Sequence, residues 1–250
     1  MITNTQSGTT IDEIGPSIYR ISTPVDIPAI PGGFTFNQYL IVDQQPLLFH
    51  TGYRRMFPLV SEAISKVMPL DRLRYAGLSH FEADECGSLN DFLAVAPQCA
   101  PVCSDLGALV SVNDAADRPA RGLASGEEFS IGSRTLQWIY TPHVPHGWDC
   151  GVLFDKSTGT LFCGDLFTQG GSQHAPVTTD DVLATSEQFR QPMDYYAHAR
   201  NTGTILENLA ELNPKLLACM HGSAFQGDAA SLLRRLAKTL ELANAEPAAR

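Results

Sequence analysis

The first hundred residues alternate between short apolar runs and segments rich in turn-forming residues. Runs of β-branched, aromatic and leucine residues predict strands over residues 17–22, 34–42, 46–50 and 73–79. Apolar residues spaced by three and four predict a helix over 59–67, with Pro69 just beyond its end. Asp84 is well placed as the N-cap of another helix, which runs through Leu89 and Leu93 and ends before Pro97.

The second half of the chain continues this alternation. Strands are predicted over 128–131, 135–140, 151–155 and 160–163, with turns at 132–133 and 157–159. Helices are predicted over 181–190, 195–212 and 228–243, and the segment LLACM reads as a buried strand that delivers His221. The order strands, helix, strands, helix predicts an α/β fold in which two sheets pack face to face with helices outside.

Composition and charge narrow the function classes. The 250 residues are 44% hydrophobic and 18% charged, so the chain can bury a substantial core. The net charge of −10 disfavours nucleic acid or an anionic membrane as a partner. No apolar run approaches the roughly 20 residues that span a bilayer. The N-terminus lacks the basic start and apolar stretch of a signal peptide, so a cytoplasmic location with reduced cysteines is expected.

Residues 79–88, SHFEADECGS, concentrate ionisable side chains in one short stretch: His80, Glu82, Asp84 and Glu85. Such a stretch is either a solvated, capped helix start or the first half of a metal site. Three later segments also follow apolar strands; they supply His143 and His146 in YTPHVPHGWD, Asp165 in LFCGDLF and His221 in CMHGSAF. Each residue alone is explained as a surface or turn residue, whereas their order and spacing together favour a metal site.

This series resembles the metallo-β-lactamase superfamily over nearly the whole chain. Hydrolases of that superfamily usually carry HxHxDH in the first loop, whereas this chain has HxExDE at residues 80–85. Glutamate at the third position resembles the diiron domain of flavodiiron proteins, with the pattern HxExDH, and especially the stand-alone oxygen-binding diiron proteins. The resemblance implies a four-layer αβ/βα sandwich with the ligand loops at one edge of both sheets.

The resemblance also implies a ligand set. One metal would be held by His80, Glu82, His146 and Asp165, and the second by Asp84, His221 and the same, bridging Asp165. His146 is preferred to His143 because its interval of 19 residues to Asp165 resembles the flavodiiron spacing, and His143 is assigned to the outer shell.

Two positions depart from the family pattern. Glu85 stands where flavodiiron proteins carry a histidine, and it either binds the second metal or turns away and leaves that metal with an open position. His50 replaces an aspartate that superfamily members usually carry in the outer shell, and we expect it to donate a hydrogen bond to a ligand carboxylate.

The donor set and the resemblance together imply the metal and the reaction. Three or four carboxylates with three imidazoles suit iron or manganese better than zinc, and the resemblance implies two iron ions, with manganese or zinc less favoured. The resemblance implies binding or reduction of O2 or NO, either as an oxygen or iron sensor or as an oxidoreductase. The alternative is a metal-dependent hydrolase of an ester, lactone or thioester.

Residues 1–250 are expected to form a single diiron domain. They contain no phosphate-cradling loop and no flavodoxin-like domain that would bind FMN, so electrons would come from an external redox protein. A signalling partner and a homodimer are both left open by the sequence.

Overall fold

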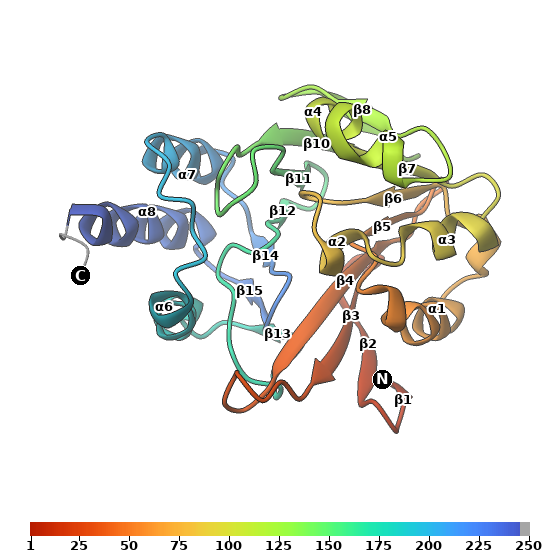
Figure 1. Ribbon diagram of the computed structural model, residues 1–250, viewed down its shortest axis with the longest axis horizontal. Coiled ribbons are helices and arrows are strands. Elements are labelled where there is room, and N and C mark those ends of the chain that lie inside the picture. Colours follow the sequence, from red (N-terminus) through yellow and green to blue (C-terminus); the bar gives the residue numbers. More distant parts are fainter. Residues whose placement is uncertain (246–250) are drawn as a thin grey trace.

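Two β-sheets lie face to face at the centre of the molecule, and helices cover the outer side of each sheet (Figure 1). The computed structural model describes residues 1–245. In the figure, α1 and α3 lie on one side of the sheets, and α6, α7 and α8 lie on the other. This arrangement confirms the predicted four-layer αβ/βα sandwich.

The first sheet contains eight strands in chain order. They are β1 (Ile2–Asn4), β2 (Thr9–Gly15), β3 (Ile18–Val25), β4 (Phe34–Ile41), β5 (Leu47–Phe49), β6 (Tyr75–Gly77), β7 (Ala100–Ser104) and β8 (Arg121–Leu123). The first five pair antiparallel and the last four pair parallel, so β5 belongs to both groups. All of β4 is buried, because both of its faces are covered.

The second sheet has seven strands in the order β13-β15-β14-β12-β11-β10-β9. Their bounds are β9 (Glu128–Ser130), β10 (Thr135–Tyr140), β11 (Gly151–Asp155), β12 (Thr160–Phe162), β13 (Val177–Thr178), β14 (Leu216–Ala218) and β15 (Ala224–Gln226). Strands β12 and β14 run parallel, with Phe162 opposite Ala218. Segments that are distant in sequence therefore leave the sheet side by side.

The helices divide between the two outer layers. They are α1 (Phe57–Ser65), α2 (Ala83–Cys86), α3 (Leu89–Val95), α4 (Asp105–Gly107), α5 (Asn113–Ala115), α6 (Val182–Met193), α7 (Thr202–Glu211) and α8 (Ala229–Ala245). None of the described helices is long and apolar enough to cross a membrane.

Three apolar clusters hold the four layers together. One joins the first sheet to α1 and α3, and another joins the second sheet to α6, α7 and α8. The third lies between the sheets and includes Tyr39, Phe49, Trp138 and Phe162. Burial of these large side chains is the main driving force that brings the two halves of the chain together.

The prediction of one continuous helix with Asp84 as its N-cap is wrong. The segment forms two short helices, α2 and α3, and the residue that precedes α2 is Glu82. Between the helices, Gly87 packs so closely that a Cβ there would clash with the Ala83 carbonyl oxygen and lie 2.8 Å from the Arg54 nitrogen. The helix breaks at the next residue, because the Ser88 N–H donates to the Gly52 carbonyl at 2.9 Å, and the break leaves Asp84 and Glu85 inside a single helical turn.

The helix predicted over 195–212 begins later than expected, at Thr202. The preceding residues do not extend the helix, because their backbone groups form hydrogen bonds to other segments. The Ala197 N–H donates to the Pro145 carbonyl, and the Tyr195 carbonyl contacts His146. The sequence analysis did not predict six of the strands, namely β1, β2, β7, β8, β13 and β15. Most of them are only two to five residues long, and such short runs give little periodicity.

Candidate metal centre

The predicted site residues come from loops that follow four strands at one edge of the two sheets. His80 follows β6, His146 lies between β10 and β11, and Asp165 and His221 follow β12 and β14. Because Phe162 pairs with Ala218, Asp165 and His221 are each the third residue beyond a paired position. Parallel pairing thus delivers these two side chains to the same place.

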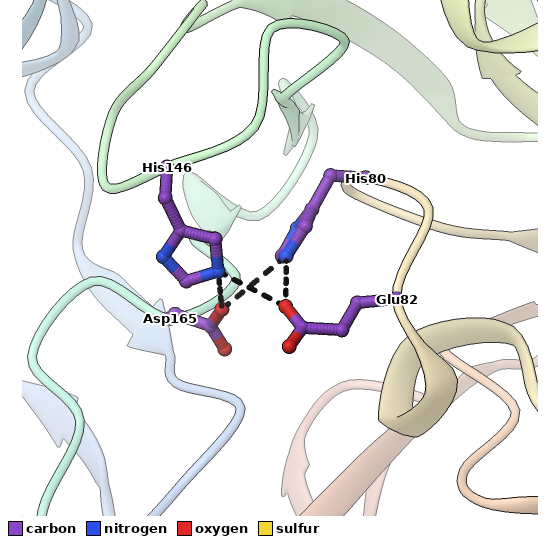
Figure 2. A group of neighbouring side chains, drawn as sticks. All are labelled: His80, Glu82, His146 and Asp165. Atoms are coloured by element: carbon purple, nitrogen blue, oxygen red, sulfur yellow. Dashed lines mark hydrogen bonds and ion pairs between the residues drawn. The ribbon is translucent and has the colours of Figure 1, made fainter. Parts of the chain in front are cut away.

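His80, Glu82, His146 and Asp165 form the first group of ligand-type atoms (Figure 2). Glu82 Oε2 lies 2.9 Å from His80 Nε2 and 3.0 Å from His146 Nε2. Asp165 Oδ2 lies 3.6 Å and 3.4 Å from the same two nitrogens. All four ligand-type atoms lie within 4.8 Å of one another, which is close enough for a single cation to contact them.

A second group lies on the other side of Asp165. His221 Nε2 is 3.3 Å from Asp165 Oδ1 and 3.5 Å from Asp84 Oδ2. The carboxylates of Glu82, Asp84 and Glu85 also offer oxygens within 4.8 Å of one another. Asp165 therefore presents one oxygen to each group, and the two groups meet at its carboxylate.

Each histidine is held by its other ring nitrogen. His221 Nδ1 lies 2.7 Å from the Thr35 carbonyl oxygen, and His146 Nδ1 lies 3.1 Å from the Tyr195 carbonyl oxygen. A carbonyl only accepts, so both rings donate from Nδ1 and point Nε2 toward the carboxylates. His80 Nδ1 lies 3.0 Å from Ser79 Oγ. The orientation is that expected of metal-binding imidazoles.

The ionisable side chains of the site change one another's pKa values. Hydrogen bonds from His146 and His80 lower the pKa of the half-exposed Glu82 to about 2. Burial alone would raise the pKa of Asp165, but the hydrogen bond with His221 and the charges of His80 and His146 outweigh it and lower that pKa. Burial also opposes charge on His80 and His221, yet the surrounding carboxylates raise the pKa of both imidazoles.

Glu85 shows the opposite behaviour. Its side chain is fully buried, and burial followed by repulsion from Asp165 raises its pKa well above the usual value of 4.5. Neither Glu85 carboxylate oxygen has a hydrogen-bond partner, and its nearest cationic contact is His80 Nε2 at 4.0 Å. An unpartnered buried carboxylate is costly. The chemistry of the donor set therefore fits cations, which would satisfy Glu85 together with its neighbours.

The two predicted outer-shell histidines differ in position. His50 is buried; its Nε2 lies 3.0 Å from Ser79 Oγ, and burial lowers its pKa to about 3. The expected hydrogen bond from His50 to a ligand carboxylate is replaced by this contact with a serine. The His143 side chain is exposed, and the structure does not bring it into either group.

Sequence reasoning missed the residues that support the site. Ser79 contacts both His80 and His50, and Asp149 accepts a 3.0 Å hydrogen bond from the Phe81 N–H and so holds the loop after His80. Thr35 and Tyr195 act through backbone carbonyls. A backbone carbonyl does not depend on residue type, so these contacts could not be predicted. Position 164 does favour glycine, because its φ is 54° and a Cβ there would lie 3.2 Å from Ser79 Oγ.

A family model described as "ODP family beta lactamase" matches residues 34–222, which include every residue of both groups. The chain belongs to this family. The matched range begins at β4 and ends just beyond His221. The family assignment agrees with the sandwich described above.

The ODP domain resembles parts of larger proteins. It is 27% identical over 201 residues to a putative diflavin flavoprotein A 1 of Nostoc sp., covering 78% of this chain and 34% of that protein. It is 28% identical over 209 residues to the rubredoxin-oxygen oxidoreductase of Megalodesulfovibrio gigas, covering 79% and 50%. The chain thus spans about a third to a half of the length of these curated relatives.

Solved structures share the fold at low sequence identity. A point mutant of the flavo di-iron protein from Thermotoga maritima superposes with a TM-score of 0.82 at 20% identity, covering 93% of this chain and 61% of that one. A fragment, 1–254, of putative diflavin flavoprotein A 5 from Nostoc sp. PCC 7120 gives 0.81 at 17% identity, covering 95% and 98%. The metallo-β-lactamase-like sandwich of the ODP family is therefore the fold of this chain.

Proposed function

We propose that this chain is a non-haem diiron protein that binds O2 or NO and reduces it with electrons from an external redox partner. The observation that carries the proposal is the position of Asp165, whose two oxygens face His80 and His146 on one side and His221 on the other. The relatives support it, because one is named a rubredoxin-oxygen oxidoreductase and another a flavo di-iron protein.

The two groups of side chains divide naturally into two ligand sets. The first ion would be held by His80, Glu82, His146 and Asp165. The second would be held by Asp84, His221, the other oxygen of Asp165 and the buried Glu85. In this proposal Glu85 is a ligand rather than an outward-facing residue, because a fully buried carboxylate without hydrogen bonds needs a cation.

The donor set favours iron over zinc. Four carboxylates would balance the four positive charges of two divalent ions, and anionic oxygen ligands stabilise the higher oxidation state. When bound, the two ions would supply the electrons and the open coordination positions that a diatomic gas requires.

The surrounding residues control access to the pair. Phe34 stacks on the His221 ring with centroids 4.3 Å apart, and Phe36 meets the same ring edge-on at 5.3 Å. Both phenylalanines are buried, so they keep water away from the His221 side. The Glu82 side chain is 52% exposed, which leaves the first group open to a small molecule arriving from solvent.

The test is anaerobic loading with Fe(II), followed by mixing with O2 or NO in a stopped-flow spectrometer. We expect two irons per chain and near-ultraviolet absorption that grows on exposure to O2. Glu82→His should slow this oxidation because a neutral imidazole replaces an anion, and Glu128→His, on the exposed edge of β9, should not.

Other outcomes assign other functions. A stable O2 adduct that does not turn over when an external reductant is supplied would make the chain a sensor rather than a reductase. The proposal would be overturned in favour of a hydrolase by three results together. The protein would selectively retain two zinc ions, it would hydrolyse a chromogenic ester or thioester, and its iron form would not react with O2.

A further inference from the structure

A chain of hydrogen bonds runs away from the metal centre behind His80. His80 Nδ1 lies 3.0 Å from Ser79 Oγ, and the same oxygen lies 3.0 Å from His50 Nε2. On the far side of its ring, His50 Nδ1 lies 2.9 Å from Met220 Sδ. All four side chains are buried, between 0% and 4% exposed, so water does not compete for these contacts.

The sulfur at the far end fixes the direction of every hydrogen in this chain. A thioether has no hydrogen and only accepts, so His50 must carry its proton on Nδ1. The bare Nε2 of a neutral His50 then accepts the single hydrogen of the Ser79 hydroxyl. Ser79 is left to accept from His80 Nδ1–H, and His80 Nε2 then points toward Glu82 and Asp165.

The backbone holds His50 in this position. Its φ of 64° is in the left-handed region, which is uncommon for a residue with a side chain. The Thr51 N–H donates to the Glu85 carbonyl at 2.7 Å, and Phe49 stacks on the His50 ring at 4.4 Å. Unfavourable backbone geometry at a buried histidine beside the site is consistent with a functional constraint.

We propose that Met220, His50 and Ser79 are positioning residues that fix His80 in its metal-binding tautomer and tie it to the strand end that carries His221. The inference rests on the proposed metal site, because the relay matters only if His80 is a ligand. Met220 directly precedes His221, so the relay connects the two ligand groups through a path other than Asp165. Unlike an aspartate behind a ligand histidine, this relay is neutral and adds no negative charge to the centre.

The first arm of the test measures the His50 tautomer in the metal-free protein. Nitrogen-15 NMR of histidine-labelled protein near neutral pH, with His50 assigned from a His50→Gln spectrum, reports which ring nitrogen carries the proton. We expect a neutral ring protonated on Nδ1 in wild type and in Met68→Leu, a control at another buried methionine. Met220→Leu removes the sulfur acceptor and should shift a large fraction of His50 to the Nε2-protonated form.

A wild-type His50 that is protonated on Nε2, or on both nitrogens, would overturn the relay. So would a Met220→Leu spectrum identical to that of wild type. This arm needs no metal, so it tests the relay even if the proposed function fails.

The second arm measures metal affinity by competition with a chromogenic chelator, using zinc as a diamagnetic probe. Ser79→Ala should weaken binding about 10- to 100-fold, as loss of an outer-shell partner typically does. Thr9→Val, at another buried hydroxyl, which is hydrogen-bonded to the Thr23 hydroxyl between β2 and β3, should leave affinity unchanged. Unchanged affinity in a folded Ser79→Ala variant would overturn the positioning role, whereas wild type that binds no metal would instead refute the proposed function.

Discussion

Two glutamates three residues apart experience opposite environments, and this contrast defines the site at the scale of single residues. Glu82 is half exposed and hydrogen-bonded by two histidines, which lower its pKa to about 2. Glu85 is fully buried without hydrogen bonds, and its pKa is raised well above 4.5. The metal-free protein therefore has one carboxylate that favours its charged form and one that opposes it.

This contrast predicts how the metal-free protein responds to pH. Folded Glu85 holds its proton more tightly than the unfolded chain does, so stability falls as pH rises above about 4.5, by up to about 1.4 kcal/mol per pH unit. The lowered pKa of Glu82 contributes stability that is lost only as pH falls below 4.5. Glu85→Gln should flatten the decline in a urea-unfolding series from pH 5 to pH 8. An unchanged slope in this variant would mean that Glu85 is not the group that resists ionisation.

The His221 loop illustrates how elements position ligands. Residues of β3 and β4, in the first sheet, reach the end of β14 in the second. Arg20 donates to the Gly222 carbonyl at 2.8 Å, and Asn37 donates to the carbonyls of Cys219 and Gly222 at 2.9 Å and 2.8 Å. The first sheet therefore supports a ligand loop that the second sheet supplies.

This support can be removed at one residue. Asn37→Ala deletes two buried hydrogen bonds and should cost about 2 kcal/mol of unfolding free energy. It should also weaken the ion held by His221 more than the ion held by His80. Asn90→Ala also loses two hydrogen bonds, one donated to the Ala115 carbonyl and one accepted from the Asp117 N–H, but both are exposed, so it should cost less than about 1 kcal/mol and spare both ions. Denaturant titration and metal analysis of both variants test these two expectations. Equal loss of the His80 ion and the His221 ion in Asn37→Ala would contradict the second.

The same elements show which features could be predicted from sequence. The strands that carry Asp165 and His221 were predictable, because they are short apolar runs bounded by turns. The break between α2 and α3 was not, because it depends on a hydrogen bond from the Ser88 N–H to the Gly52 carbonyl, which lies far away in sequence. The motif and the resemblance predicted His80, Glu82 and Asp165 as site residues, and the fold brings them together, but the contacts of Ser79 and Met220 arise only from tertiary packing.

At the scale of the whole molecule, each half of the chain supplies part of the centre. The first sheet contributes the loop that carries His80, Glu82, Asp84 and Glu85, and the second contributes His146, Asp165 and His221. Asp165 lies where the two ligand groups meet. The proposal that Asp165 bridges two ions therefore places the metal pair where the two sheets meet.

The most direct test of that claim is electron paramagnetic resonance of the iron-loaded protein after partial reduction. If Asp165 bridges two irons, their spins couple, and we expect a mixed-valence signal from coupled ions in protein that contains two irons per chain. Asp165→Ala should lose this signal and most of the metal, because the remaining ligands cannot offset the repulsion between two cations. If the wild-type protein contains two irons per chain but gives only the signal of isolated ferric ions, Asp165 does not bridge them.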